Sequence, residues 1–367
     1  MGDALAFLTE SLGALDAASA RRVRRSRVPD GLVNLSSNDY LGLGGSVAGL
    51  DDMPPAPWGA GASRLVTGDT AHHEDLERAL ADWLSCKDAL VFSSGYAANV
   101  GVIGALMANG DLIVSDEKNH ASIIDGCRLS RARVVVVPHL DAAAVELSLA
   151  TIPHRRAMVV TESWFSMDAD TPDLPRLRNV CDEYSAVLMV DEAHALGVFG
   201  PDGRGLCAGC GVVPDILIGT FGKALGGSGA FVAGPHLLLD WLWNRARSFV
   251  FSTGMSPQMA AVLARRVGLV RAANGARVRL AAMSARVRGS CPSGLSVLGH
   301  GPIVPVVLGT NDRALTASAL LRARGFHVVA IRPPTVPENT ARLRLTLRAD
   351  CTDDDVERLV AALGILA

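Results

Sequence analysis

Short apolar segments alternate with helical segments between residues 89 and 233, and this alternation constrains the fold more than any other feature of the sequence. The intervening stretches suit helices, for example at Ala97–Met107 and Leu174–Tyr184. Strands that are apolar throughout are typical of a mostly parallel sheet whose two faces are covered by helices. The predicted fold class is therefore α/β. We expect the strands at Ala89–Phe92, Leu112–Val114, Arg133–Val137, Met158–Thr161, Val187–Val190, Ile216–Gly219 and Ala230–Ala233.

The pattern changes on both sides of this region. Residues 1–30 have the pattern of an amphipathic helix followed by a turn at Pro29. A helical stretch runs from about Pro235 to about Arg288 and is broken near Ser248–Pro257. Beyond it we expect strands at Ile303–Leu308 and Leu343–Leu347 and helices at Arg313–Arg324 and Asp353–Leu363. These patterns predict an N-terminal helical segment (1–45), a large domain (46–255) and a smaller α+β C-terminal domain (256–367).

Composition excludes several classes of protein. Hydrophobic residues make up 49% and charged residues 20%, as in globular chains. The net charge of -2 gives no overall field that attracts nucleic acid or an anionic membrane. No apolar stretch approaches the roughly 18 residues of a membrane span. Asp3 and Glu10 precede every basic residue, unlike in a signal peptide. We therefore expect no nucleic-acid partner and no membrane partner.

The seven cysteines are odd in number and scattered, which fits a reducing, cytoplasmic location better than a disulfide framework. Cys207 and Cys210 form a CxxC pair, but no second pair accompanies it, so we expect no zinc site. His72, His73, Glu74 and Asp75 also resemble metal ligands. Because they begin a helical stretch, a solvated first turn is the better interpretation.

Two strands lead into residues that can carry chemistry, at the sheet edge where ligands bind in open parallel sheets. Asp191 follows an apolar strand, and a carboxylate there is costly to bury unless it meets a cation or a donor. Lys223 follows another strand and lies among glycines and other small residues. A lysine that loses solvation has a lowered pKa and becomes an amine nucleophile. Alone, each residue has a plain alternative, an ion pair for Asp191 and a surface charge for Lys223.

A third motif, Ser93–Asn99, follows a strand and opens a helix, where backbone N–H groups can hold a phosphate. A lysine, an acid and a phosphate cradle are the three requirements of a pyridoxal 5'-phosphate (PLP) site. The lysine forms the Schiff base with the cofactor, and the acid keeps the pyridine nitrogen protonated. The three motifs together therefore predict a PLP enzyme that carries its cofactor on Lys223.

From about Val33 to the C-terminus, the sequence resembles the α-oxoamine synthases, which are fold-type-I PLP enzymes that condense an amino acid with an acyl thioester and release carbon dioxide. The resemblance rests on NLSSNDYLGL, FSSGYAAN, KNHASIIDG, VVTESWFSMDAD, VLMVDEAHALGVFG and TFGKALGGSGAF. The segment AIRPPTVPENTARLRLTL favours the member of the biotin pathway. That resemblance implies a homodimer acting on L-alanine and a pimeloyl thioester, carried by acyl carrier protein (ACP) or by coenzyme A (CoA).

The resemblance also implies roles for individual residues. Lys223, Asp191 and His120 are the expected catalytic residues, His120 stacking on the cofactor ring. Arg332 and Thr335 are expected to contact substrate, and an N-terminal arginine, Arg24 or Arg25, to meet the acyl chain. The expected cofactor-binding residues are Gly95, Tyr96, His120, Ser166, Asp191, His194, Thr220, Lys223 and Thr253, the last of which would reach the phosphate of the partner subunit.

Three alternative functions can be weighed against this prediction. The letters DEAH at Asp191–His194 also name a helicase class, but that class requires an upstream GxxxxGK[ST] loop, which the sequence lacks. A non-catalytic subunit of the same fold would lack the lysine, whereas Lys223 is present. Another α-oxoamine synthase remains open, either one that joins glycine to an acetyl group or one that uses longer acyl thioesters in secondary metabolism.

Overall fold

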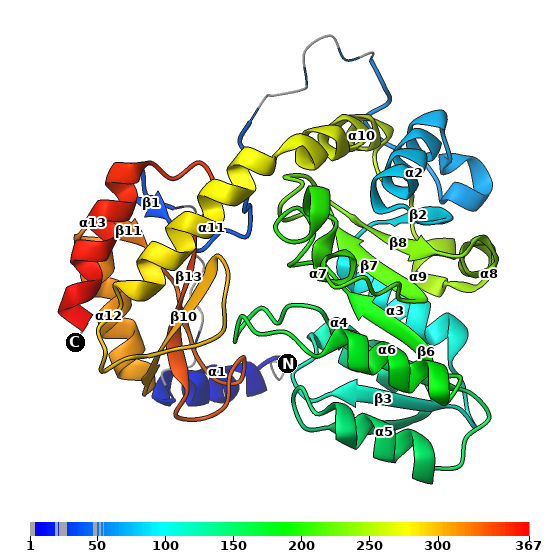
Figure 1. The fold of residues 1–367 in the computed structure, drawn as a ribbon, viewed down its shortest axis with the longest axis horizontal. Coiled ribbons are helices and arrows are strands. Elements are labelled where there is room, and N and C mark those ends of the chain that lie inside the picture. The colour runs from blue at the N-terminus through cyan, green and yellow to red at the C-terminus, as the bar shows by residue number, and fades with distance from the viewer. Residues whose placement is uncertain are drawn as a thin grey trace. The chain divides into compact units, whose positions relative to one another are not determined.

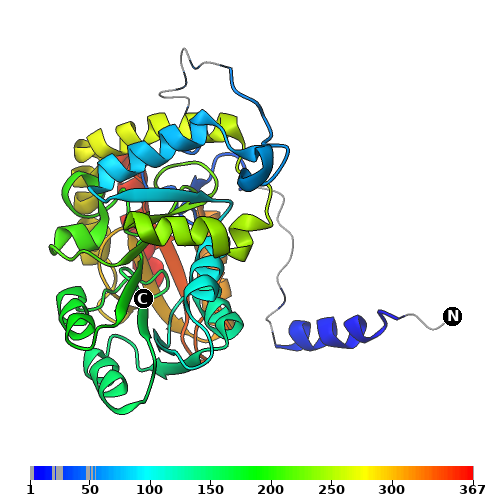
Figure 2. The same ribbon diagram turned by 90° about the vertical axis from the view of Figure 1, so that its right-hand side faces the viewer.

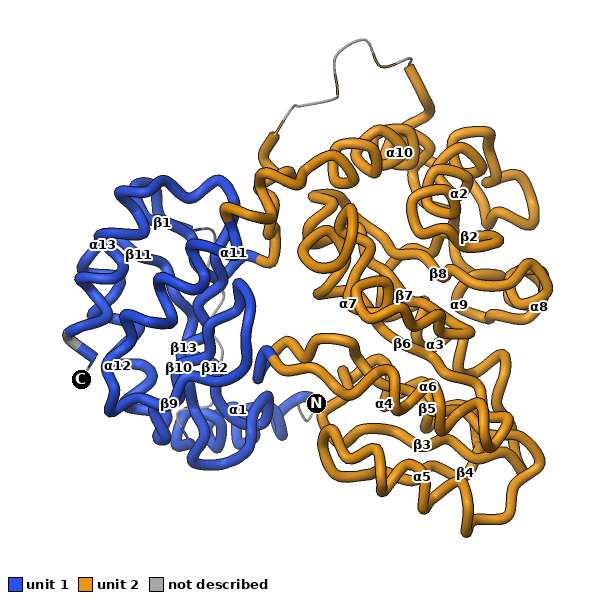
Figure 3. The backbone as a smooth tube through the Cα atoms, viewed as in Figure 1, with its two compact units in different colours: residues 1–37, 167–169, 280–367 blue, residues 38–166, 170–279 orange. Residues whose placement is uncertain are grey.

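The computed structural model describes residues 4–18, 21, 28–46, 50, 53 and 55–366, drawn as a ribbon in Figures 1 and 2. The chain divides into two compact units, coloured separately in Figure 3. Unit 1 comprises residues 1–37, 167–169 and 280–367, and unit 2 comprises residues 38–166 and 170–279. Each unit is described by itself below.

A seven-stranded sheet forms the centre of unit 2, in the order β2-β8-β7-β6-β5-β3-β4. Neighbouring strands are parallel except at β8, which is antiparallel to both β2 and β7. The sheet is therefore mostly parallel, as predicted. Its strands are β2 (Asp88–Phe92), β3 (Leu112–Asp116), β4 (Arg133–Val137), β5 (Ala157–Glu162), β6 (Val187–Asp191), β7 (Ile216–Thr220) and β8 (Ala230–Gly234).

Helices cover both faces of this sheet, and a separate buried cluster lies on each face. One cluster joins the sheet to α3 (Gly95–Leu106), α4 (Ala121–Ser130), α8 (His236–Arg245) and α9 (Arg247–Val250). The other joins it to α5 (Ala142–Thr151), α6 (Leu174–Glu183) and α7 (Gly205–Gly209). Because helices bury both faces of the inner strands, those strands are apolar throughout, which is the pattern seen in the sequence; the edge strand β4 is largely exposed. Unit 2 also contains α2 (Ala71–Leu84) and α10 (Pro257–Ala272).

Unit 1 has an α+β arrangement. Its four-stranded sheet has the order β12-β13-β10-β9, and β1 pairs in parallel with β11. The strands are β1 (Val33–Asn34), β9 (Ser296–Val297), β10 (Ile303–Gly309), β11 (Phe326–His327), β12 (Ala330–Ile331) and β13 (Ala341–Thr346). The helices are α1 (Phe7–Ala17), α12 (Asn311–Ala323) and α13 (Asp353–Leu363), while α11 (Asn274–Gly289) begins in unit 2.

The predicted elements lie close to the observed ones, and β4 and α13 have the predicted bounds. The helical stretch after Pro235 is broken three times, after Arg245, between Val250 and Pro257, and at Ala273. Helix α10 belongs to compact unit 2, whereas the predicted C-terminal domain begins at residue 256. The predicted domain bounds stay a prediction. Within the part of the chain that the structure describes, no helix is long and apolar enough to cross a membrane.

The predicted solvated turn at residues 72–75 is wrong for one of its members. These residues do lie in the first turns of α2, but His73 is completely buried. Its Nδ1 lies 2.9 Å from Thr70 Oγ1 and its Nε2 lies 2.9 Å from Met255 O. Burial lowers the pKa of His73, so the neutral ring serves as a hydrogen-bonded core residue.

A buried ion pair ties α2 to the edge of the sheet. Arg64, with a side chain 3% exposed, pairs with Glu77 of α2, and Glu77 Oε1 also accepts the N–H of Val91 in β2 at 2.8 Å. The guanidinium lies 5.2 Å from the ring centre of Trp243. Burial raises the pKa of Glu77, and the Arg64 pair opposes that change. Glu77 therefore depends on Arg64 to remain charged.

We predict that Arg64→Met lowers the free energy of unfolding by about 3–5 kcal/mol, because it leaves Glu77 buried without its cation. Arg78→Met is the matched control, since Arg78 pairs with Glu74 and Asp75 on the exposed face of the same helix. It should cost less than about 1 kcal/mol. Urea unfolding monitored by circular dichroism measures both values, and equal losses would contradict the assignment.

Candidate active site

The candidate site lies at one edge of the unit 2 sheet. β5, β6 and β7 are neighbouring parallel strands that end at Glu162, Asp191 and Thr220. Glu162 and Asp191 are partners in the strand register. The carboxyl ends of adjacent parallel strands meet at one edge, which is the edge where such sheets bind ligands.

Asp191 is 7% exposed, and its carboxylate is held by two donors. Asn99 Nδ2 of α3 donates to Oδ2 at 2.8 Å, and the Ala193 N–H donates to Oδ1 at 2.8 Å. Asn99 Nδ2 also lies 3.0 Å from Ser122 Oγ of α4. These donors stabilise the charged carboxylate where burial would otherwise be costly, and they fix its orientation.

His120 lies at the start of α4, beside the acidic strand ends. Its backbone N–H donates to Glu162 Oε1 at 2.7 Å, and its Nδ1 lies 2.8 Å from Ser122 Oγ. Burial lowers the pKa of His120; the charge of Asp191 opposes this change and that of Lys223 adds to it. The ring is therefore neutral near pH 7, and a neutral imidazole face suits stacking on a flat cofactor.

Burial raises the pKa of Glu162 to about 8, and the nearby charge of Asp191 acts in the same direction. The charge of Lys223 and the N–H of His120 oppose this rise. Lys223 is half-buried in the loop after β7 and is near enough for its charge to act on both Glu162 and His120. The structure thus brings the amine of Lys223, the imidazole of His120 and the carboxyl groups of Glu162 and Asp191 to one edge of the sheet.

His194 is anchored on the same side of the sheet. The hydroxyl of Tyr40 lies 2.7 Å from His194 Nδ1, and Tyr40 is completely buried. The ring of Trp164 packs against Tyr40 with the centres 6.0 Å apart. These contacts hold the imidazole of His194 in one orientation and direct its Nε2 away from Tyr40.

The first turn of α3 forms a cradle for an anion. Ser94 Oγ accepts the N–H of Ala97 at 3.1 Å, which caps the helix. The N–H groups of Gly95 and Tyr96 belong to the same turn, where the helix itself supplies no acceptor. A Cβ on Gly95 would meet no atom within 4 Å, so the space in front of the turn is open. A phosphate suits such a position.

These residues fit PLP. Lys223 supplies the amine, Asp191 a buried carboxylate, His120 a neutral ring, and Gly95 and Tyr96 the N–H groups of the first turn of α3. No metal is needed for this set, because its members are an amine, an acid and helix N–H groups rather than a group of ligands around one point.

The family model of aminotransferase class I and II matches residues 30–363. The chain belongs to this family. The solved relatives include a serine palmitoyltransferase from S. paucimobilis with PLP and myriocin bound, at 26% identity and a TM-score of 0.91 over 100% of this chain and 98% of the other. The predicted fold-type-I fold and the PLP cofactor are thereby confirmed.

Curated relatives narrow the resemblance. A protein of Anaeromyxobacter dehalogenans named 8-amino-7-oxononanoate synthase is 46% identical over 95% of this chain and 93% of its own length. One of Mycolicibacterium gilvum with the same name is 45% identical over 96% and 94%. A solved 8-amino-7-oxononanoate synthase from Francisella tularensis is 25% identical, with a TM-score of 0.76 over 92% of this chain and 98% of the other. The predicted resemblance to this enzyme of the α-oxoamine synthases is confirmed.

The remaining predicted site residues lie mostly in loops around the sheet of unit 2 or in unit 1, and their roles stay predictions. Ser166 is half-buried in the loop after β5, and Thr253 is exposed after α9. Thr220 Oγ1 donates to Gly229 O at 3.0 Å across the lysine loop. Arg332 and Thr335 follow β12 in unit 1, where the Thr335 N–H donates to Arg332 O at 3.1 Å. Arg24 and Arg25 lie outside the described residues.

Sequence reasoning missed Tyr40, Asn99 and Glu162. Each lies inside a segment that carried the family resemblance. Glu162 had a usable signal, because it ends an apolar strand just as Asp191 does. Asn99 and Tyr40 had none, because their partners Asp191 and His194 are far away in sequence.

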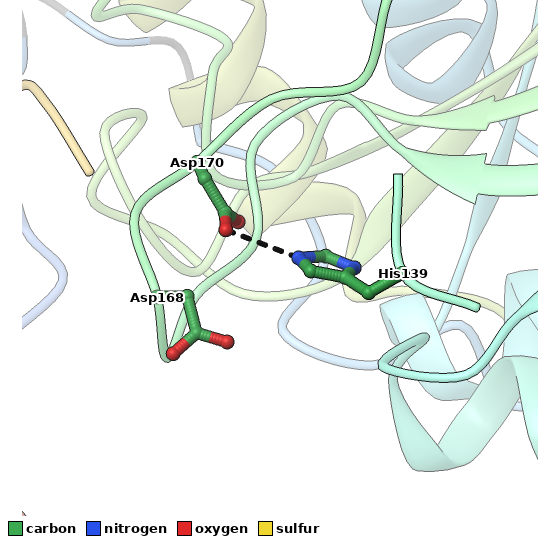
Figure 4. A group of neighbouring side chains, drawn as sticks. All are labelled: His139, Asp168 and Asp170. Atoms are coloured by element: carbon green, nitrogen blue, oxygen red, sulfur yellow. Dashed lines mark hydrogen bonds and ion pairs between the residues drawn. The ribbon is translucent and has the colours of Figure 1, made fainter. Parts of the chain in front are cut away.

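A second cluster holds the loop that leaves β5 (Figure 4). His139, 10% exposed, has its Nδ1 2.9 Å from Asp116 Oδ1 and its Nε2 3.1 Å from Asp170 Oδ2. Phe165 packs edge-on to the ring, with the centres 4.5 Å apart. Asp168, also drawn in Figure 4, belongs to unit 1 and pairs there with Arg342. His139 thus ties the loop containing Ser166 to the end of β3.

Burial by itself lowers the pKa of His139, but the hydrogen bonds to Asp116 and Asp170 outweigh it and raise the pKa to about 9. Because the folded-state pKa lies above the ordinary value of 6.5, the stabilisation is complete below pH 6.5 and is lost as the pH rises through 9. The difference corresponds to about 3 kcal/mol at most.

We predict that His139→Gln lowers the free energy of unfolding by up to about 3 kcal/mol at pH 6, and by much less at pH 9.5. Urea unfolding at both pH values measures the two differences. The control is His236→Gln, because His236 is an exposed partner of Asp88 and should contribute under about 1 kcal/mol at either pH. An effect of His139→Gln that does not change with pH would contradict the charged bridge.

Proposed function

We propose that this chain condenses L-alanine with a pimeloyl thioester to give 8-amino-7-oxononanoate, carbon dioxide and the free carrier thiol, a step of biotin biosynthesis. The observation that carries the proposal is that a buried, doubly hydrogen-bonded Asp191 and Lys223 both lie near enough to Glu162 and His120 for their charges to act on them, in a chain 46% identical to a relative named for this reaction. The reaction needs an amine, an acid and a neutral ring, which this edge supplies.

PLP bound at this edge supplies an electron-accepting ring that stabilises negative charge on the α-carbon of the amino acid. Lys223 would hold the cofactor, and Asp191 would keep a proton on the pyridine nitrogen, since an opposite charge nearby favours the charged form. His120 would stack on the ring, and Gly95 and Tyr96 would bind the phosphate. Ser166, His194 and Thr220 would make the remaining polar contacts.

The amine of Lys223 is the proposed proton carrier of the reaction. With alanine in its place on the cofactor, the free amine would take the proton from the α-carbon. That carbon would form its new bond to the acyl carbonyl as the C–S bond breaks, and the carrier would leave as a thiolate that takes a proton from solvent. After loss of carbon dioxide, Lys223 returns a proton to the same carbon. The electrostatic influence of Lys223 on Glu162 and His120 supports its placement at this edge.

Substrate recognition is proposed to use residues outside the cofactor set. Arg332 would bind the carboxylate of alanine with two parallel hydrogen bonds, as a guanidinium can, with Thr335 nearby in sequence. Arg24 or Arg25 would meet the acyl chain, which is carried by ACP or CoA. We propose a homodimer in which Thr253 reaches the partner's phosphate, and a cytoplasmic location in keeping with the scattered cysteines.

A second candidate follows from the solved relatives. Besides the enzyme from S. paucimobilis, the serine palmitoyltransferase of Sphingomonas wittichii is 28% identical, with a TM-score of 0.90 over 100% of this chain and 98% of the other. A condensation of serine with a long-chain acyl thioester is therefore the main competitor, followed by glycine with acetyl-CoA. The higher identity to the curated relatives favours alanine with the pimeloyl thioester.

The proposal is tested by a matrix of alanine, serine and glycine against pimeloyl, palmitoyl and acetyl thioesters, with carbon dioxide release and product mass as readouts. Alanine with the pimeloyl thioester should have the highest kcat/KM. It should exceed glycine with the same thioester by at least about tenfold, which is what one methyl group in a pocket contributes. Lys223→Ala should abolish turnover. A faster reaction with serine and palmitoyl thioester would overturn the substrate assignment and leave the cofactor assignment intact.

A further prediction concerns Asp191. Asp191→Asn should lower kcat by about 100-fold or more, because the neutral amide no longer favours the protonated pyridine nitrogen. The kcat is expressed per bound cofactor, because the amide can accept from only one of the two donors that hold the carboxylate and some loss of stability is expected. Asp82→Asn is the control, since Asp82 is an exposed carboxylate that pairs with Arg271 on the surface. Near-normal turnover of Asp191→Asn would make Asp191 a structural residue.

A further inference from the structure

Arg266 of α10 is a buried arginine that has carbonyl groups for partners. Arg266 is 5% exposed. Within the described residues it forms no ion pair with a carboxylate. Its Nη1 donates to Gly226 O, and its Nη2 donates to Ser46 O at 2.9 Å. Its Nε has no hydrogen-bond partner among the residues that the structure describes. Burying a guanidinium costs free energy, and the bonds to Gly226 O and Ser46 O are the ones that offset this cost.

The first acceptor, Gly226, belongs to the turn that carries Lys223. The Gly226 N–H donates to Lys223 O at 2.9 Å, and the next N–H, of Gly227, donates to Phe221 O at 2.7 Å. These two bonds close the loop on both sides of the lysine. The carbonyl of Gly226 lies between them in the chain, so Arg266 holds the loop at its closing point.

Two glycines of this loop, Gly226 and Gly227, have no free space around them. A Cβ on Gly226 would come within 2.6 Å of Gly44 N, and one on Gly227 within 2.5 Å of the Leu263 side chain on α10. Gly226 also has a φ of +64°, which disfavours other residues. The lysine loop is therefore pressed between α10 and the segment around Gly44, with Arg266 bonded to it from α10.

The second acceptor, Ser46, ends the segment 38–46, which reaches another part of the site. Asp39 accepts the N–H groups of Leu43 and Gly44 at 2.9 and 2.8 Å and so shapes this segment. Its Tyr40 places a hydroxyl 2.7 Å from His194 Nδ1. One guanidinium thus bonds to the segment that orients His194 and to the loop that presents Lys223.

We propose that Arg266 is a positioning residue that locks the Lys223 loop and the 38–46 segment to α10 through their carbonyl groups, and so fixes the direction from which the Lys223 amine approaches its reacting atoms. The inference rests on the proposed role of Lys223 as the lysine that carries the cofactor and moves the proton. A planar fork can serve two diverging carbonyls at once, whereas a lysine ammonium is a single point of charge on a flexible stem. Removing the fork leaves two half-buried carbonyl groups without this donor.

The test compares Arg266→Met and Arg266→Lys with the control Arg271→Met, which removes an exposed arginine of the same helix that pairs with Asp82. Hydrogen exchange of the Gly226 and Gly227 amides is measured on the cofactor-free and the PLP-loaded full-length protein. Exchange of the Met189 and Val190 amides in β6 reports global opening. Turnover is measured as kcat per bound cofactor and as KM for both substrates.

In Arg266→Met the Gly226 and Gly227 amides should exchange at least about tenfold faster, equivalent to about 1.4 kcal/mol of lost protection, while the β6 amides stay unchanged. The kcat per bound cofactor should fall at least about tenfold with KM within twofold, because the lysine is misplaced and the substrate contacts are untouched. Arg266→Lys should fall between wild type and Arg266→Met, and Arg271→Met should match wild type.

Unchanged exchange at Gly226 and Gly227 with normal kcat in Arg266→Met would overturn the proposal. So would faster exchange that is equal in the loop and in β6, because that result describes a purely structural arginine. If Arg266→Met does not fold, Arg266→Lys decides by the same two criteria. If the assignment of alanine and the pimeloyl thioester is wrong, only the turnover of the wild-type protein changes. The hydrogen exchange of the cofactor-free protein would still show the difference between Arg266→Met and wild type.

Discussion

The arrangement of the site depends on the burial of the Asp191 carboxylate at the end of β6. A buried carboxylate keeps its charge only if donors replace water, and the two donors here come from the Ala193 N–H and from Asn99 of α3. Asn99 lies one turn from Gly95 on the same helix. The bond that stabilises the acid therefore also fixes the helix whose first turn forms the anion cradle.

Charge balance at the neighbouring strand ends follows from the same constraint. Glu162 and Asp191 are register partners, and two negative charges so close are unfavourable. Burial and the charge of Asp191 together raise the pKa of Glu162, while Lys223 lowers it. The positive charge of Lys223 thus opposes the rise in the pKa of Glu162, and together with burial it lowers the pKa of His120. The protonation of Glu162 and of His120 therefore depends on the charges of Asp191 and Lys223.

The sequence was sufficient for the elements and for the residues that stand at strand ends, such as Asp191 and Lys223. It could not indicate that β8 is antiparallel to its neighbours, because a strand with two dry faces has the same apolar composition in either direction. It could not reveal Asn99 or Tyr40 as partners either, since these pairings depend on how α3 and the 38–46 segment pack. Burial of His73 was missed because its partner Met255 is 182 residues away.

The proposed cofactor residues and the proposed amino-acid-binding residues belong to different units of the chain. Every residue with a proposed contact to PLP, from Gly95 to Thr253, belongs to unit 2, whereas Arg332 and Thr335 belong to unit 1. Charge couples Glu162 to Asp191 and to Lys223, so a change in either neighbour alters the pKa of Glu162. The proposed substrate residues Arg332 and Thr335 belong to the other unit. A unit that carries all the proposed cofactor residues is compatible with more than one acyl group, and relatives named for different acyl groups do share this fold. The shared fold therefore supports the cofactor assignment more directly than the choice of alanine and a pimeloyl group.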